Sequence, residues 1–210
     1  MRTITVDPAR CRPEELAPAI EWLRADGVVA VPTDTFYGLA VNPTSSIAVR
    51  RLFELKGREP RAALPLIAAS VHDVERSCGR LGPTEARLAS AFWPGPLSLL
   101  LDAPPAMAAE VHGGLGTIAI RVPAHRVAQA LCAAWGGPLT ATSANRSGAP
   151  PAASARALGD LADDARLLIV DGGVTHGGAP STIIDARGAV PLLLREGAIA
   201  WKRVLESLKE

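Results

Sequence analysis

The chain has 210 residues, 48% of them hydrophobic, which is enough to bury a full core. Its 22 basic and 21 acidic side chains nearly cancel, which excludes a protein coated with positive charge for nucleic acid. Any RNA contact would therefore be weak and would come from a local cluster. The sequence has neither the long apolar run of a membrane helix nor that of a signal peptide. We expect a soluble cytosolic protein with no membrane partner.

Short predicted strands alternate with helices along the chain, a pattern typical of an α/β or α+β domain. We expect a single domain over 1–210, built around one strongly twisted mixed β-sheet flanked by helices. The predicted helices cover 14–25, 45–55, 84–92, 124–134 and 199–209. The predicted strands cover 28–31, 64–68, 97–101, 117–122, 139–143, 167–171, 182–185 and 192–194.

The first buried strand is followed directly by residues 32–38, PTDTFYG, with two hydroxyls, a carboxylate and the only tyrosine of the chain. Asp and Thr at a strand end favour a turn. Strand ends are also where α/β sheets bind ligands, so Thr35 and its neighbours are candidates for a site.

Three cations follow the helix over 45–55, namely Lys56, Arg58 and Arg61. A cation at a helix C-terminus complements the helix dipole, which accounts for Lys56 without any ligand. The two arginines lie in a loop rich in Gly and Pro, and such a loop could grip a polyphosphate. Both interpretations stay open at this point.

Residues 117–122, TIAIRV, show the clearest alternation. In an extended strand Ile118, Ile120 and Val122 share one face and face the core. Thr117 and Arg121 share the other face with Ala119 between them, so a hydroxyl and a guanidinium point into one space. Arginine there suits bidentate recognition of a carboxylate or a phosphate, although a solvent-facing arginine is the simpler alternative.

Residues 139–148, LTATSANRSG, begin as a strand and end in a loop of hydroxyl, amide and glycine groups. If the strand continues to Ser143, that residue and Asn145 face the same side, where they suit nucleotide oxygens and base edges. Ordinary turns use the same residue types. The glycine-rich segment 171–182 forms either a lid with Ser181 at its base or an exposed connection. Arg195 ends the last strand.

Cys11, Cys78 and Cys132 have neither disulfide nor metal spacing, so we expect reduced thiols. The four histidines show no metal spacing either, and no metal ligand is predicted. The chain lacks a P-loop and a nucleophile elbow.

Taken together, these segments resemble the YrdC-like family of threonylcarbamoyl-AMP synthases, whose fold is YrdC/RibB-like. The resemblance runs in order through PTDTFYGLA (32–40), KGR with LPLIAAS (56–70), WPGPLSLLL (93–101), TIAIRVP (117–123), TATSANRSG (140–148), PSTIIDA (180–186) and LREG (194–197). It covers a core of about 14–197.

The resemblance implies an enzyme that joins L-threonine, bicarbonate or CO2, and ATP into threonylcarbamoyl-AMP and pyrophosphate, with Mg²⁺ accompanying ATP. A partner transferase would then carry the threonylcarbamoyl group to tRNA. Matching positions place the catalytic Lys56 and Arg58 on the triphosphate. They place Thr117, Ser143, Asn145 and Arg195 in the ATP site, and Thr35, Arg121 and Ser181 around threonine.

The chain departs from the family pattern at Ala69-Ser70, where many relatives have a histidine near the threonine pocket. The loop over 59–63 also differs from the compact form we expect. Longer relatives carry a second C-terminal domain behind a linker, for which we expect no counterpart in these 210 residues. Two rival functions use the same residues: a carbamoyl-transfer module with a carbamoyl-adenylate intermediate, and a non-catalytic RNA- or nucleotide-binding module.

Overall fold

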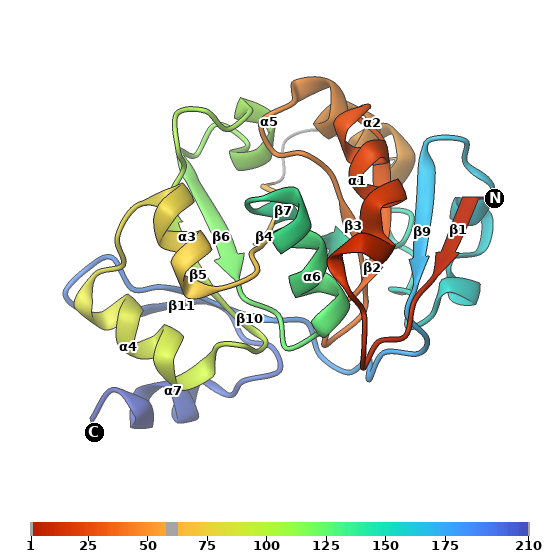
Figure 1. Ribbon diagram of the computed structural model, residues 1–210. Coiled ribbons are helices and arrows are strands. Elements are labelled where there is room, and N and C mark those ends of the chain that lie inside the picture. The colour runs from red at the N-terminus through yellow and green to blue at the C-terminus, as the bar shows by residue number, and fades with distance from the viewer. Residues whose placement is uncertain (1, 58–62, 210) are drawn as a thin grey trace.

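The computed structural model describes residues 2–57 and 63–209, and within them the strands form two mixed sheets rather than the single sheet that we expected (Figure 1). The first sheet has the order β1-β9-β2-β3-β8 and the second β11-β10-β5-β6-β4-β7. The first comprises β1 (Arg2–Thr5), β9 (Leu167–Asp171), β2 (Val28–Pro32), β3 (Tyr37–Ala40) and β8 (Thr142–Ser143). The second comprises β11 (Leu192–Arg195), β10 (Thr182–Asp185), β5 (Leu97–Asp102), β6 (Thr117–Arg121), β4 (Leu66–Ile67) and β7 (Leu139–Thr140).

The segment 139–143 explains why one sheet becomes two. We predicted one strand there, but β7 pairs with β4 of the second sheet, and β8 pairs with β3 of the first. Between them the Ala141 amide donates to the Pro65 carbonyl at 2.8 Å. The chain therefore crosses from one sheet to the other within five residues, and hydrophobic pattern alone contains no sign of that crossing.

The α-helices are α1 (Ala17–Arg24), α2 (Ser46–Lys56), α3 (Val71–Cys78), α4 (Pro83–Phe92), α5 (Ala109–His112), α6 (Arg126–Trp135) and α7 (Trp201–Ser207), with 3-10 segments η1 (Pro13–Leu16) and η2 (Ala155–Asp163). Helix α2 follows the predicted rules closely. The Ser45 hydroxyl accepts from the Ala48 amide, and Gly57 ends the helix in the left-handed region at φ 61°.

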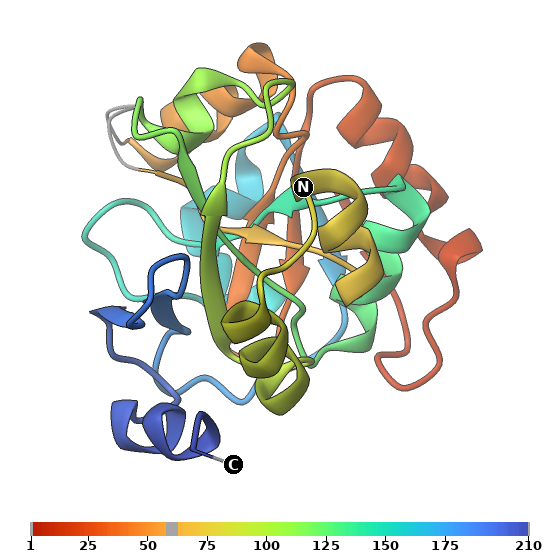
Figure 2. The same ribbon diagram turned by 90° about the vertical axis from the view of Figure 1, so that its left-hand side faces the viewer.

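Strand β2 is buried on both faces and separates two apolar cores. Val28 and Ala30 pack into the larger core, whereas Val29 and Val31 pack into the smaller one beneath α1 and α6. These two helices lie together over the first sheet, while α4 and α7 cover the far end of the second (Figures 1 and 2). Packing in the two cores holds the two sheets in a fixed relative position. A site formed between the sheets requires this.

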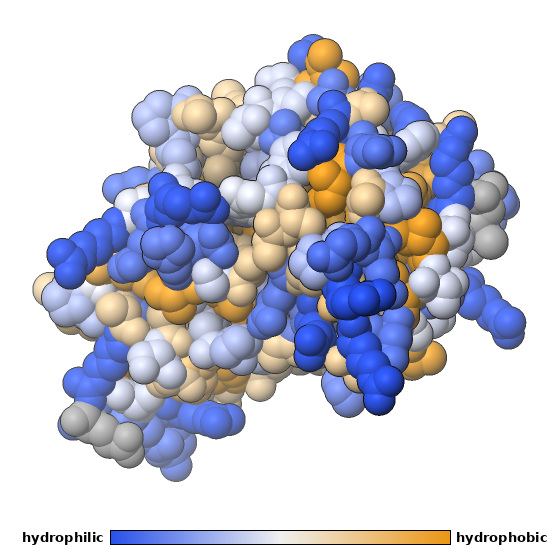
Figure 3. Space-filling view, viewed as in Figure 1, coloured by the Kyte–Doolittle hydropathy of each residue, from blue (hydrophilic) through white to orange (hydrophobic). Residues whose placement is uncertain are grey.

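The face seen in Figure 3 is mostly hydrophilic, with apolar side chains in small separate patches. Across residues 2–57 and 63–209, no helix has the length and apolar character needed to cross a membrane.

Candidate functional site

A cavity of about 420 Å³ opens between the two sheets and gathers side chains from segments far apart in the chain. Its lining includes six residues that the sequence nominated, namely Thr35, Thr117, Arg121, Ser143, Ser181 and Arg195. The lining also contains Thr33, Tyr37, Ile67 and Leu100. Polar groups converging on one partly enclosed cavity are typical of a ligand site.

Strand register places both site arginines in one row across the second sheet. Arg195 pairs with Ile183, Ile183 with Ser98, and Arg121 with Ile67. The β5–β6 register pairs Leu99 with Ile120, so its continuation sets Ser98 opposite Arg121. Direct cross-strand partners point to the same face, so both guanidiniums face the cavity.

The predicted alternation in β6 is confirmed. Ile118 and Ile120 are buried in the core, and Thr117, Ala119 and Arg121 line the cavity. The period of two therefore assigned each side chain of this strand to the correct face.

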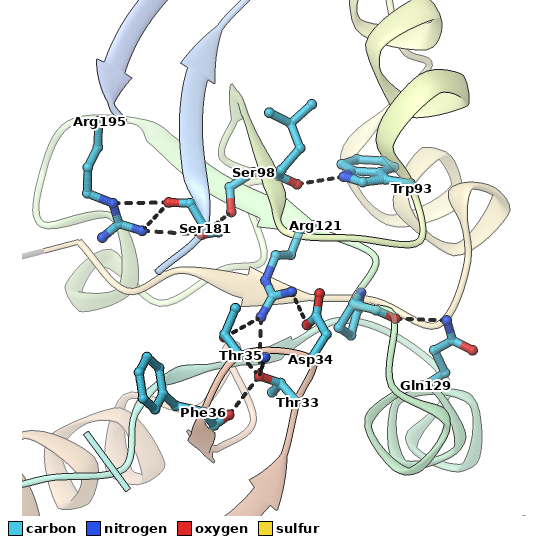
Figure 4. Close-up of polar contacts among 12 residues, drawn as sticks. Thr33, Asp34, Thr35, Phe36, Trp93, Ser98, Arg121, Gln129, Ser181 and Arg195 are labelled. Carbon is cyan, nitrogen blue, oxygen red and sulfur yellow. Dashed lines mark hydrogen bonds and ion pairs between the residues drawn. The ribbon is translucent and has the colours of Figure 1, made fainter. Parts of the chain in front are cut away.

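Arg121 is itself buried, and the two sides of its guanidinium fork have different partners (Figure 4). One terminal nitrogen forms a buried ion pair with Asp34 Oδ1. The other contacts the Thr33 and Thr35 hydroxyls at 3.4 and 3.5 Å, longer than a good hydrogen bond. The second nitrogen is thus loosely held, on the side that a ligand carboxylate could approach.

Arg195 lies at the other end of the row and grips the base of the glycine-rich segment. Its guanidinium donates to the Ser181 carbonyl at 2.7 and 3.2 Å and to the Ser181 hydroxyl at 3.2 Å. No carboxylate pairs with it among the described residues. Partial burial lowers the pKa of the Arg195 guanidinium, and the positive charge of Arg121 lowers it further. Two cations facing one cavity favour an anionic ligand.

Lys56 is buried at 3% exposure and lies against the loop that follows β8 rather than in the cavity lining. Its ammonium donates to the Ser143 carbonyl at 2.5 Å and to the Asn145 carbonyl at 2.9 Å. The Ser143 hydroxyl in turn donates to Asn145 Oδ1 at 2.6 Å. The Ser143 and Asn145 side chains therefore contact each other, although Asn145 is not among the residues that line the cavity, and Lys56 holds their loop in place.

The glycine-rich segment after β9 is tied to the strand-end loop that begins at Pro32. The Gly177 amide donates to the Thr35 carbonyl at 2.8 Å, and the Thr175 amide to the Ala153 carbonyl at 2.8 Å. The Tyr37 hydroxyl donates to the Gly173 carbonyl at 2.7 Å. Burial and the nearby Asp171 carboxylate raise the pKa of Tyr37 to about 12, so the hydroxyl stays protonated and able to donate. These hydrogen bonds anchor the segment to its neighbours at several points.

Arg58 and Arg61 lie outside the described residues. The PTDT run pointed to Asp34 only as a neighbour of Thr35 without a role of its own, and Ser98 was not nominated. Asp34 could have been found from the PTDT run, where a carboxylate between two threonines precedes a buried tyrosine. Ser98 could have been found as the single hydroxyl in the strand LSLLL.

The cysteines do not add a reactive thiol to the site. The three cysteines are free thiols; burial raises the pKa of Cys78 to about 11 and that of Cys132 still more. Such thiols are protonated and unreactive near neutral pH. No group of three or more His, Cys, Asp and Glu within the described residues could hold a metal ion.

Residues 21–197 match the model of the Sua5/YciO/YrdC family, described as telomere recombination. The chain belongs to this family. A threonylcarbamoyl-AMP synthase of Bacillus subtilis (strain 168) is 38% identical over 191 residues, covering 90% of this chain and 55% of the relative. One from Alkalilimnicola ehrlichii is 45% identical over 172 residues, covering 80% of this chain and 90% of that relative.

Among solved structures, Pyrococcus abyssi Sua5 complexed with L-threonine superposes with a TM-score of 0.91 at 35% identity, covering 99% of this chain and 61% of that one. The expected family and the mixed α/β fold are thus confirmed. This Sua5/YciO/YrdC chain spans about half the length of the Bacillus relative.

Proposed function

We propose that this chain makes threonylcarbamoyl-AMP from L-threonine, bicarbonate or CO2, and ATP, with release of pyrophosphate. The observation that carries the proposal is the cavity itself. It brings two arginines together with the hydroxyls of Thr35, Thr117, Ser143 and Ser181, from segments of both sheets. The synthases of the same family, at 38% and 45% identity, support it.

The chemistry requires two anionic groups to be held side by side. The threonine amine first adds to CO2 to form a carbamate, or reacts with bicarbonate with loss of water. A carbamate oxygen then attacks the α-phosphorus of ATP, and pyrophosphate leaves with the electron pair of the broken P–O bond. Positioning and charge stabilisation supply most of the rate in such transfers.

In this proposal the amino acid lies at the Arg121 end of the row. The loosely held guanidinium nitrogen of Arg121 binds the carboxylate of the substrate L-threonine. This contact replaces its long contacts with the hydroxyls of Thr33 and Thr35. Thr35 and Ser181 supply hydroxyls beside it.

ATP lies toward Arg195, which has no carboxylate partner among the described residues and can take negative charge from the nucleotide. Thr117, Ser143 and Asn145 complete that side. We also keep Arg58 on the triphosphate. Lys56 acts there by shaping the Ser143–Asn145 loop from beneath.

ATP would bring Mg²⁺ with it. The cavity lining has no carboxylate among the described residues, and the Oδ1 of the nearby Asp34 is engaged by Arg121. The phosphates and water would therefore provide most of the ligands of the ion. We propose a tRNA threonylcarbamoyl transferase as the consumer of the product, because the adenylate is an activated carbamoyl donor.

The proposal is tested by pyrophosphate release from ATP by the purified chain, with L-threonine and bicarbonate together and with each omitted. Release that needs both supports the proposal. Release that ignores threonine but needs carbamoyl phosphate would instead indicate a carbamoyl-transfer module. Salt-sensitive tRNA binding without any release would indicate a binding module.

A further inference from the structure

Ser98 is the second residue of β5 and stands between leucines, in the run Leu97 to Leu101. Leu97, Leu99 and Leu101 of β5 all face the larger core. Alternation therefore turns Ser98 and Leu100 to the opposite face, where Leu100 lines the cavity. Ser98 is 1% exposed and lies beside Ile183, another residue of the cavity lining. It thus lies just beneath the cavity floor, in the same row as Arg121 and Arg195.

Among residues 2–57 and 63–209, the Ser98 hydroxyl has one hydrogen-bond partner, the Ser181 hydroxyl at 2.9 Å (Figure 4). Oxygen positions allow either hydroxyl to be the donor. The remaining contacts decide between the two directions, because a buried hydroxyl that does not use its hydrogen loses free energy.

If Ser181 donated to Ser98, the Ser98 hydrogen would have no acceptor among the described residues. If Ser98 donates to Ser181, its hydrogen is used. Ser181 then accepts from both Ser98 and Arg195, which fills its two lone pairs. Only its own hydrogen remains, and Ser181 lines the cavity. The second arrangement leaves only the Ser181 hydrogen unused, and that hydrogen belongs to a side chain that borders the cavity, where a ligand can accept it.

We propose that Ser98 is a positioning residue that makes the Ser181 hydroxyl a hydrogen-bond donor directed into the cavity. The group it meets must be an acceptor, such as a carboxylate or carbamate oxygen of the amino-acid substrate. This inference rests on the proposed function for the identity of that substrate. Ser98 itself touches no ligand and acts only through Ser181.

The test is a double-mutant cycle of Ser98→Ala and Ser181→Ala in pyrophosphate release with varied L-threonine. One neutral hydrogen bond corresponds to about a 3- to 10-fold change, so we expect each single variant to raise KM for threonine by about that factor. The double variant should be no worse than Ser181→Ala, because Ser98 has nothing to direct once Ser181 is gone. KM for ATP in Ser98→Ala should stay within about 2-fold of the unsubstituted chain.

Thr117→Ala provides the matched control pair. Thr117 lines the same cavity but lies four residues from Arg121 along β6, or about 13 Å at the usual rise of a strand. Combined with Ser98→Ala, its effect should be additive. Thermal unfolding of every variant shows whether an activity loss comes from the changed orientation of the Ser181 hydroxyl or from a damaged fold.

The outcomes separate this inference from the function on which it rests. An unsubstituted chain without threonine-dependent release would overturn the proposed function, and the ligand inferred here with it. An active chain in which Ser98→Ala changes nothing, or adds its full effect to Ser181→Ala, would overturn the positioning role of Ser98 alone.

Discussion

Arg121 and Asp34 form a buried ion pair whose two side chains are each 8% exposed. Asp34 Oδ2 has no hydrogen-bond partner in the part of the chain that the structure describes, so that carboxylate depends on Arg121 for its stabilisation. Removing one member of a buried pair leaves an uncompensated charge, which typically costs about 3–5 kcal/mol. An alanine at Arg121 would therefore damage the fold as well as the site, and activity alone could not assign its role.

We predict that Arg121→Ala lowers kcat/KM for threonine by roughly 30- to 1000-fold, the usual loss for one charged transition-state contact. It should also lower the free energy of unfolding. The double variant Arg121→Ala with Asp34→Ala should recover much of that stability and stay inactive, since no buried charge is left alone. Urea unfolding and initial rates measure the two effects separately. Activity in the stable double variant would remove Arg121 from the site.

Lys56 shows how a residue can serve a site from outside its lining. Its ammonium holds the carbonyls of Ser143 and Asn145, and the Lys56 carbonyl accepts from the Ser147 amide at 2.9 Å. The sequence offered a helix-dipole role and a phosphate role for this cation. The contacts add a third role, which is to shape the loop that carries Ser143 and Asn145, two candidates for binding the nucleotide.

We predict that Lys56→Met, similar in length but uncharged, lowers the free energy of unfolding by about 1–3 kcal/mol, because it leaves carbonyls unsatisfied. It should also speed amide hydrogen exchange over residues 143–149 and raise KM for ATP. Lys202→Met is the matched control, since the Lys202 side chain is 88% exposed. Unchanged exchange in Lys56→Met would contradict the loop-shaping role.

At the scale of elements, the segment after β11 clamps the start of β10. The Ala198 amide donates to the Pro180 carbonyl at 2.8 Å, and the Gly197 amide donates to the Thr182 hydroxyl at 3.0 Å. A Cβ on Gly197 would lie 2.1 Å from the Pro180 carbonyl oxygen, which is backbone and cannot move aside. This close approach explains the glycine of the LREG run and holds Ser181 next to Arg195.

We predict that Gly197→Ala displaces the 180–182 backbone and lowers activity by at least about 10-fold, because site geometry must hold within a fraction of an ångström. The thermal midpoint should fall too. Gly188→Ala is the control, since its Cβ would meet nothing nearer than 3.8 Å. Equal activity of the two variants would exclude the clamp.

Most of the predicted strands coincide with strands of the structure to within one residue at each end. The strands over 167–171 and 182–185 agree residue for residue with β9 and β10. Helices α3 and α5 and strands β1 and β3 were not predicted. Strand β3 contains Tyr37 and Gly38 directly after turn-forming residues, so local sequence favours a turn, and pairing with β2 overrides it.

At the scale of the whole molecule, low pH should destabilise the fold, because it protonates carboxylates that form ion pairs beside both sheets. Hydrogen bonds from the Arg166 guanidinium lower the pKa of Asp164, next to β9, to about 2. Those from Arg187 lower the pKa of Asp185, at the end of β10. A carboxylate with a depressed folded-state pKa stabilises the fold above its unfolded pKa. That stabilisation is lost as the pH falls through the folded value.

We predict that unfolding free energy declines between pH 4 and pH 2, with each pair contributing about 1 kcal/mol or less because solvent screens it. Asp164→Asn should make this decline shallower. Asp160→Asn, at an exposed position nearby, should leave the slope unchanged. Urea midpoints measured at half-unit pH steps decide the matter. If the unfolding free energy of Asp164→Asn declines with the same slope as that of the unsubstituted chain, the Asp164–Arg166 ion pair is excluded as a source of acid sensitivity.

The sequence by itself determined which face of β6 meets the ligand space, where α2 begins and ends, and the family of the chain. Those properties depend on residues close in sequence, or on motifs in a preserved order. Only the tertiary structure decided that 139–143 joins two sheets, that Asp34 occupies half of the Arg121 fork, and that Ser98 lies under Ser181. Each of these contacts joins residues about 80 or more positions apart, or depends on which strands pair, and neither periodicity nor spacing carries that information.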